Sequence, residues 1–176
     1  MLNTAVESLC WKFEKQALND PDLIDKLTLS LCDNTGISYP DFRLHLLLSE
    51  LITNAIDHGV LNLDSNLKES DSGFQKYSVQ RAKRLDALES GWISVNAEWV
   101  SAELLRISVQ DNGEGFDYES IANNEIDEHC LHGRGLLIVK SLCTSVVHIG
   151  SGNCIVVEFQ PEPTPIVNAA LSADCS

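Results

Sequence analysis

The apolar residues of segment 38–59 recur every three or four positions, which is the period of an amphipathic helix with one buried stripe. We expect Ser38 to cap this helix, because Asp41 follows three residues later and Pro40 falls in the first turn. Gly59 is expected to mark its C-terminal end. The stripe consists of Leu44, Leu47, Leu48, Leu51, Ile52, Ala55 and Ile56.

Three other segments are expected to be helical. Segment 19–31 opens with Asn-Asp-Pro and has apolar residues at helical spacing, and Gly36 lies beyond its end. Segment 74–88 carries much of the chain's positive charge, and segment 133–140 is a helix that begins with glycines. Between strands and helices, segment 118–131 is expected to be short helical or irregular structure.

The period changes to two after Gly91. Segments 92–99 and 104–110 alternate apolar and polar residues, which predicts two antiparallel strands with one buried face. Segments 146–149 and 154–159 are expected to form a closing hairpin around a glycine-rich turn. The order of elements predicts an α+β fold, a two-layer sandwich in which a mixed, mainly antiparallel sheet carries helices on one face.

Length and charge limit the kinds of function. A chain of 176 residues fits one domain with its own core, and no apolar run is long enough to span a membrane. The net charge of −14 repels nucleic-acid phosphates and anionic lipid, so we expect neither as a partner. The N-terminus lacks the pattern of a signal peptide, and we expect a cytoplasmic protein. A phosphate-bearing ligand would have to be held locally by backbone amides, a metal ion or a single base.

Metal-binding cysteine patterns are not evident. The six cysteines include no C-x-x-C pair, and His129, Cys130 and His132 have no matching pair elsewhere with zinc-ligand spacing. We therefore expect reduced thiols and no zinc site. The cysteines are Cys10, Cys32, Cys130, Cys143, Cys154 and Cys175.

The polar face of helix 38–59 carries the first candidate site. Glu50, Asn54 and His58 recur every four residues and so share one side of the helix. They could be a solvated surface. However, Glu50 has no lysine partner one turn away, and asparagine is a mediocre helix former. An asparagine oxygen suits a magnesium ion that also touches phosphates, and a glutamate can accept a proton from an attacking hydroxyl.

The stretch SVQDNGEGFD, residues 108–117, is the second candidate. It could be a tight turn, but no alternating strand follows it as a hairpin would require. Gly113 and Gly115 allow the backbone to approach a ligand closely, and Asp111 could accept a hydrogen bond from an exocyclic amine.

A glycine-led helix start is the third candidate. Gly133, Arg134 and Gly135 precede an apolar run, and helix N-termini offer free amides to phosphates. Arg134 could add a bidentate contact. The alternative is a flexible hinge before the helix. The chain has no Walker A lysine motif, no G-x-G-x-x-G and no pair of H-R-D and D-F-G, so the P-loop site and the common protein-kinase site that these motifs define are excluded.

The three motifs together, ELITNAIDHG, DNGEGF and HGRGLLIVK, resemble the Bergerat-type ATP-binding module of gyrase, heat-shock chaperone, histidine kinase and MutL proteins, the GHKL superfamily. The resemblance covers roughly residues 8–160 and looks closest to the anti-sigma-factor serine kinases, because Glu50 stands four residues before Asn54 and the last motif is G-R-G-L. It implies an ATP-binding domain over 1–160 with a helical insertion at about 61–90. The last sixteen residues, 161–176, are expected to be a loosely ordered tail.

The resemblance also implies roles for single residues. Asn54 would bind Mg²⁺, and Glu50 would activate a substrate serine as the catalytic base. Asp111 would form a hydrogen bond with the adenine amine, and Gly113 and Gly115 would border the adenine pocket. The phosphates would lie on Gly133, Arg134, Gly135 and Leu136, beneath a lid formed by residues 117–132.

The same resemblance implies partners. Such kinases phosphorylate a small STAS-type anti-anti-sigma protein or sequester a sigma factor, and they often form a homodimer. Segment 58–93 is also similar to modules fused behind PP2C-type phosphatase and receiver domains. We therefore expect an ATP- and Mg²⁺-dependent serine kinase of a bacterial partner-switching pathway. The alternatives are a non-catalytic ATP-dependent partner-binding module and, less favoured, the catalytic domain of a histidine kinase, because no helical hairpin with a phosphoacceptor histidine precedes the motifs.

Two features depart from the family pattern, namely Asp57 and a short, acidic lid that carries Glu119, Glu125, Asp127 and Glu128. Asp57 stands where several such kinases have a lysine, so we expect a second acid near the triphosphate. In the insertion, Arg81, Lys83 and Arg84 are expected to form a solvated helix face rather than a docking site for an acidic partner.

Overall fold

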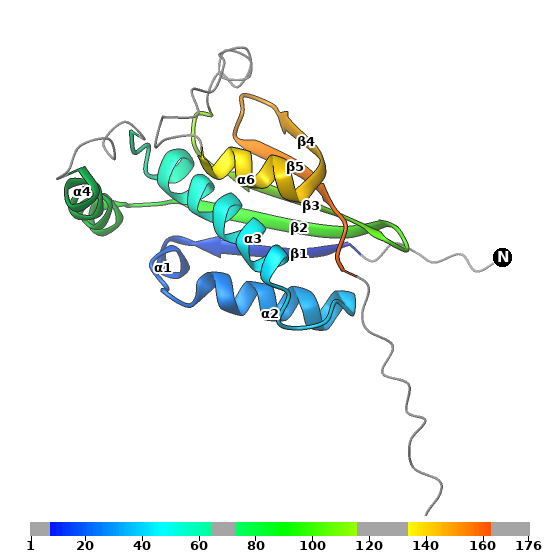
Figure 1. The fold of residues 1–176 in the computed structure, drawn as a ribbon. Coiled ribbons are helices and arrows are strands. Elements are labelled where there is room, and N and C mark those ends of the chain that lie inside the picture. The colour runs from blue at the N-terminus through cyan, green and yellow to red at the C-terminus, as the bar shows by residue number, and fades with distance from the viewer. Residues whose placement is uncertain (1–7, 65–72, 116–133, 163–176) are drawn as a thin grey trace, which may run out of the picture.

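The computed structural model describes residues 8–64, 73–115 and 134–162. Within them lies a five-stranded sheet of order β1-β2-β3-β5-β4, and Figure 1 shows α2, α3 and α6 on one of its faces. The elements are β1 Leu9–Glu14, α1 Lys15–Leu18, α2 Leu23–Thr35, α3 Phe42–Asn54, η1 Ala55–Val60, α4 Gly73–Ala87, β2 Trp92–Ser101, β3 Leu104–Asp111, α6 Arg134–Leu142, β4 Cys143–Ile149 and β5 Cys154–Phe159.

The sheet confirms the predicted α+β class. β2 and β3 pair antiparallel, with Val95 opposite Val109, and their alternate residues are buried as the period of two required. The predicted hairpin is β4 and β5. We expected a mixed sheet, but every strand pairing among the described residues is antiparallel. The final hairpin adds β5 directly beside β3, which keeps neighbouring directions opposed.

The first strand, β1, was missed in the sequence. Leu9, Trp11 and Phe13 alternate with polar residues and face the core, and β1 pairs with β2 at the edge of the sheet. The Trp11 Nε1 donates a hydrogen bond to Ser30 Oγ of α2 at 3.2 Å. The alternation was present, but three apolar residues are a weak signal in so short a segment.

The start of α3 differs from the prediction. Asp41, not Ser38, is the N-cap, and its side chain accepts a hydrogen bond from Leu44 N at 2.8 Å. Pro40 follows a cis peptide bond and lies before the helix instead of in its first turn. Two cap-type residues stood three positions apart, and local sequence did not decide between them.

The end of α3 also differs. The chain does not stop at Gly59 with a left-handed residue but continues as the π-helical turn η1, in which Leu61 N donates to Ile56 O at 2.8 Å. By contrast, Gly36 adopts φ 76° at the end of α2, as expected. The α2 helix itself runs four residues later than predicted, over Leu23–Thr35. Helix α4 matches the predicted helix 74–88 to within one residue.

The core lies between the predicted stripe of α3 and the inner face of the sheet. The stripe residues of α3 are at most 1% exposed, and they pack with the buried residues of β2, β3 and β5. This burial fixes the rotation of α3 about its axis, so that its opposite side carries Glu50 and Asn54, both half-buried. In the part of the chain that the structure describes, no helix has the length and apolar character needed to cross a membrane.

Three expectations concern residues that the structure does not describe. Outside the described residues lie segment 118–131, the lid over 117–132 and the expected tail 161–176, except for Pro161 and Glu162. Gly133 also lies outside them.

Candidate functional site

The end of α3 and the start of α6 meet closely at Gly135. A Cβ atom on Gly135 would lie 2.4 Å from Glu50 Oε2 and 3.7 Å from Asn54 Nδ2. Ordinary contacts between such atoms are about 3.5 Å or longer, so only glycine allows this approach without a shift of Glu50. The structure therefore brings together two motifs that are about 80 residues apart in the sequence, and it does so through the residues singled out for catalysis and phosphate binding.

The described part of α6 begins at the residues expected to bind phosphate. Arg134 is the first residue of α6 and is exposed, and Gly135 and Leu136 follow it in the first turn. The first amides of a helix have no partner within the helix and carry the positive end of its dipole. The carboxylate of Glu50 thus lies beside a helix end that favours anions.

A second cluster forms where β3 ends. Asp111 is only 7% exposed, and its Oδ1 accepts a hydrogen bond from Gly113 N at 2.8 Å. Burial raises the pKa of the Asp111 carboxyl, although the Gly113 amide opposes the shift. One oxygen is therefore fixed by the loop. A carboxylate has acceptor sites on both of its oxygens, so Asp111 has the chemistry to accept an N–H from a base.

Gly59 forms the other wall of this cluster, a role that the sequence did not reveal. A Cβ atom on Gly59 would lie 2.3 Å from Asp111 Cγ and 2.5 Å from each carboxylate oxygen. A Cβ atom on Gly113 would likewise lie 2.3 Å from Gly59 O. The turn η1 and the loop after β3 therefore touch backbone to backbone, and glycine is needed for close approach and not for ending the helix.

The stretch 108–117 is not a hairpin turn. Both edges of β3 are already paired, one with β2 and the other with β5, so the chain after β3 does not pair back with it. The loop that follows β3 packs on the β4–β5 turn. Gly115, expected at the adenine pocket, has φ 84° and lies where a Cβ would be 2.2 Å from Ser151 O. Asn153 fixes the strand end by donating from Nδ2 to Asp111 O at 3.2 Å. Gly115 thus shapes the loop against the hairpin.

The insertion helix α4 is attached to η1 by polar contacts. Asp57 is 2% exposed, and its carboxylate accepts hydrogen bonds from Tyr77 Oη at 2.8 Å and from Arg81 Nε at 2.7 Å. Arg84 Nη1 donates to Leu61 O at 2.6 Å and also to Asn62 O. Burial and the Asp57 carboxylate raise the pKa of Tyr77.

These contacts correct two expectations. Asp57 is not an open acid beside the triphosphate, because its charge is buried against Arg81. Arg81 and Arg84 are not a solvated face, whereas Lys83 is exposed as expected. The spacing of Tyr77 and Arg81, one helical turn apart, indicated a shared face, but nothing in the sequence identified Asp57 as their partner.

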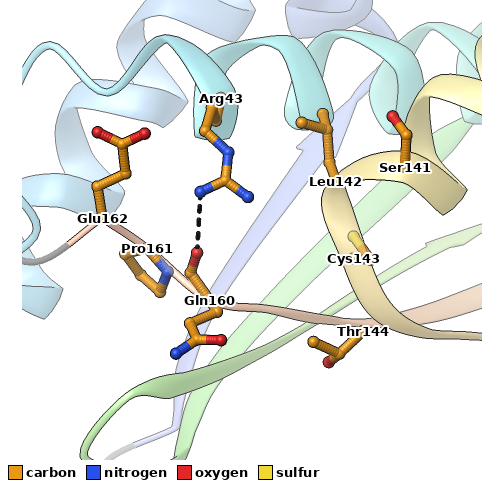
Figure 2. A pocket seen from close by; sticks show the side chains of 8 residues that line it. All are labelled: Arg43, Ser141, Leu142, Cys143, Thr144, Gln160, Pro161 and Glu162. Carbon is orange, nitrogen blue, oxygen red and sulfur yellow. Dashed lines mark hydrogen bonds between the residues drawn. The ribbon is translucent and has the colours of Figure 1, made fainter.

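A separate pocket of about 340 Å³ lies at the other end of α3. Figure 2 shows Arg43 over it, with Arg43 Nη1 donating to Gln160 O at 3.4 Å. Arg43 and Asn54 are separated by eleven residues of helix, which corresponds to about 16 Å. The pocket therefore does not belong to the cluster around Gly135. It is lined by Arg43, Ser141, Leu142, Cys143, Thr144, Gln160, Pro161 and Glu162.

The described residues contain no group of three or more His, Cys, Asp or Glu side chains that could hold a metal ion. A magnesium ion would therefore need ligands from a nucleotide and water as well as from Asn54. The donor set fits such an ion, because Mg²⁺ commonly keeps water and takes one or two protein oxygens together with phosphates.

Comparison with known families gives one match, and it includes the residues of both clusters. The family described as "Histidine kinase-, DNA gyrase B-, and HSP90-like ATPase" matches residues 41–163. No curated protein matches the chain significantly.

Proposed function

Because the chain belongs to the histidine kinase-, DNA gyrase B- and HSP90-like ATPase family, an ATP-binding family, we propose that it is a Mg²⁺-dependent protein serine kinase. The observation that carries this proposal is the contact of Gly135 with Glu50. It places a carboxylate beside the helix end that would hold phosphates. A general base has to lie near the transferred phosphoryl group, and phosphates held at this helix end would lie beside Glu50.

The adenine would lie against the cluster at the end of β3. Asp111 is buried against Gly59 and Gly113, and the absence of side chains on these glycines lets the backbone on both sides approach the carboxylate closely. The Oδ2 atom would accept a hydrogen bond from the exocyclic amine of adenine. Guanine has a carbonyl oxygen at that position, so the same contact would favour adenine nucleotides.

Asn54 would hold Mg²⁺ through its side-chain oxygen, one turn after Glu50 on the same face of α3. When bound, Mg²⁺ neutralises charge on the triphosphate and orients it. Arg134 and the first amides of α6 would add further positive potential to the γ-phosphate. Their contribution is positioning and charge neutralisation, which is the main catalytic requirement of phosphoryl transfer.

Glu50 would act on the incoming serine. As the serine Oγ attacks the γ-phosphorus in line, its proton moves to the Glu50 carboxylate, and the bond from phosphorus to the β–γ bridging oxygen breaks. ADP leaves and phosphoserine remains. A carboxylate suits this role because it only needs to orient and receive one proton late in a loose transition state.

We propose a STAS-type anti-anti-sigma protein as the phosphate acceptor, with a sigma factor as a second binding partner. The order and the residues of the three motifs support this choice, since they resemble those of anti-sigma-factor kinases. A homodimer and fusion to PP2C-type phosphatase and receiver domains are part of the same proposal.

Phosphoryl transfer from labelled ATP to candidate STAS proteins, with Mg²⁺ present, tests the proposal. We expect Glu50→Gln to lower transfer by at least about 100-fold while ATP still binds, as for loss of a general base. Glu103→Gln is the matched control, because Glu103 is exposed in the β2–β3 turn. Unchanged transfer in Glu50→Gln would refute Glu50 as the base. Tight ATP binding without any phosphoprotein would favour the binding module, and acid-labile phosphohistidine would favour a histidine kinase.

A further inference from the structure

The π-helical turn η1 is held from two opposite directions. On one side, Asp57 accepts hydrogen bonds from Tyr77 and Arg81 of α4. On the other side, Gly59 lies against the carboxylate of Asp111. Asp57 and Gly59 are two residues apart in the same turn, so a shift of the backbone at Asp57 would also shift Gly59.

The geometry of η1 needs this support. A π-helical turn contains one more residue per hydrogen-bonded ring than an α-helix, so the residues that follow are rotated by about 100° relative to a continuous α-helix. In this chain Gly59 is part of the turn η1, and it lies against Asp111 and Gly113. Isolated π-helical turns are rare and are frequently found at functional sites.

Helix α4 is joined to the rest of the protein through few buried side chains. Only Gly73, Tyr77 and Leu85 of its fifteen residues are buried, while Phe74 is 75% exposed. Figure 1 shows α4 set to one side of the sheet and its covering helices, beyond the end of α3. The hydrogen bonds of Tyr77, Arg81 and Arg84 to η1 and the chain just after it are therefore a substantial part of the attachment.

We propose that Arg81 and Tyr77 are positioning residues of the nucleotide site, which act through Asp57 to hold η1 so that Gly59 and Asp111 form the adenine wall. The inference rests on the proposed binding of adenine nucleotides. It assigns a role to the insertion, whose helix α4 would set nucleotide affinity from outside the pocket.

The chemistry of the three side chains supports this role. Asp57 is too deeply buried to remain charged without a partner, and Arg81 provides a matching charge while Tyr77 donates to the second oxygen. If Arg81 is removed, the buried carboxylate loses its ion-pair partner, and η1 has to shift to bring the carboxylate to water. Gly59, in the same turn, then moves with it.

A different role for Arg81 would be direct contact with the γ-phosphate, as a substitute for the lysine that Asp57 replaces. The two roles differ in which nucleotides they affect. Positioning through Gly59 and Asp111 alters the adenine end and weakens ATP and ADP equally. Direct contact with the γ-phosphate weakens ATP much more than ADP.

Binding of ATP and ADP, measured by calorimetry on the full chain, tests the proposal. We expect Arg81→Ala to raise both dissociation constants about tenfold or more, with their ratio unchanged, which is within the usual range of coupling between sites. Tyr77→Phe removes one hydroxyl and should raise both constants by a smaller factor. Arg81→Lys should recover part of the affinity, and Lys83→Ala, on the exposed side of the same helix, should change neither constant more than about twofold.

Urea unfolding of each variant establishes that the binding is measured on folded protein, and Tyr77→Phe serves if Arg81→Ala does not fold. Unchanged constants in folded Arg81→Ala and Tyr77→Phe would overturn the inference. A loss confined to ATP would also overturn it, in favour of direct phosphate contact. Failure of the unaltered protein to bind either nucleotide would instead refute the proposed function, so the two failures are distinguishable.

Discussion

Gly59→Ala tests the close contact between η1 and the end of β3. A Cβ atom on residue 59 would be 2.3 Å from Asp111 Cγ, and the three nearest atoms all belong to the carboxylate. Non-bonded carbon and oxygen atoms prefer separations of about 3.5–4.0 Å, so the carboxylate has to retreat by about 1 Å or more. Such a movement breaks its 2.8 Å hydrogen bond from Gly113 N.

The expected loss of stability is the difference between two effects. A hydrogen bond to a charged group contributes about 1.5–3 kcal/mol. Replacing glycine by alanine within a helix, at a residue whose φ is not positive, contributes about 0.5–1 kcal/mol in the opposite direction. We therefore expect Gly59→Ala to lower the free energy of unfolding by about 1–2 kcal/mol. If the adenine amine loses its contact with Asp111, the affinity for ATP falls by about tenfold to 100-fold.

Urea unfolding and ATP calorimetry should be measured for Gly59→Ala, Asp111→Ala and the double variant. In the Asp111→Ala background the obstructing carboxylate is absent, so Gly59→Ala should become neutral or stabilising and should cost no further affinity. A loss of stability from Gly59→Ala that disappears when Asp111 is alanine can arise only from the contact between residue 59 and the Asp111 carboxylate. A Gly59→Ala change that stabilises the unaltered background and leaves ATP affinity intact would refute the close approach.

Two further predictions concern the other groups of the site. Gly135→Ala should change the free energy of unfolding by less than about 1 kcal/mol, because the atom 2.4 Å from the added Cβ is Glu50 Oε2, the end of a flexible side chain. Displacement of Glu50 should lower phosphoryl transfer more than ATP affinity, with Lys140→Ala of the same helix as the control. Equal losses of transfer and affinity would contradict this prediction. Burial raises the pKa of Asp111 above the ordinary 3.8, so the native protein takes up a proton at a pH where the unfolded chain does not. As the pH falls through that raised pKa, the contribution of Asp111 to the free energy of unfolding therefore increases. ATP affinity falls over the same range, because a protonated carboxyl is a poorer hydrogen-bond acceptor. A pH dependence of ATP affinity identical to that of Asp111→Asn would contradict this prediction.

The elements that sequence predicted correctly are those whose burial imposes a strict period. The stripe of α3 and the alternation of β2 and β3 each contain enough buried residues to define one face. Where the choice depended on a single local group, the prediction was wrong. Ser38 and Asp41 are both good caps, and in the structure it is Asp41 whose side chain accepts a hydrogen bond from Leu44 N.

The candidate site was predictable in its residues but not in its internal contacts. Glu50, Asn54 and Gly135 were recognised from separate motifs, and the structure brings them together. The significance of Gly59 could not be predicted, because a glycine near a helix end usually indicates a C-cap, and only the π-helical turn shows that it packs on Asp111.

Asp57 shows most directly why a motif has to be interpreted with its structural neighbours. In the sequence it replaces a basic residue and adds negative charge near a triphosphate. In the fold that charge is buried and paired with Arg81, which lies 24 residues away in the insertion. The acid and the insertion are therefore one feature: the carboxylate would be too costly to bury without α4, and α4 would lose a main point of attachment without the carboxylate. In the proposed nucleotide site, Asp57 taken alone would weaken the phosphate end, whereas Asp57 paired with Arg81 would allow a surface helix to hold the adenine end.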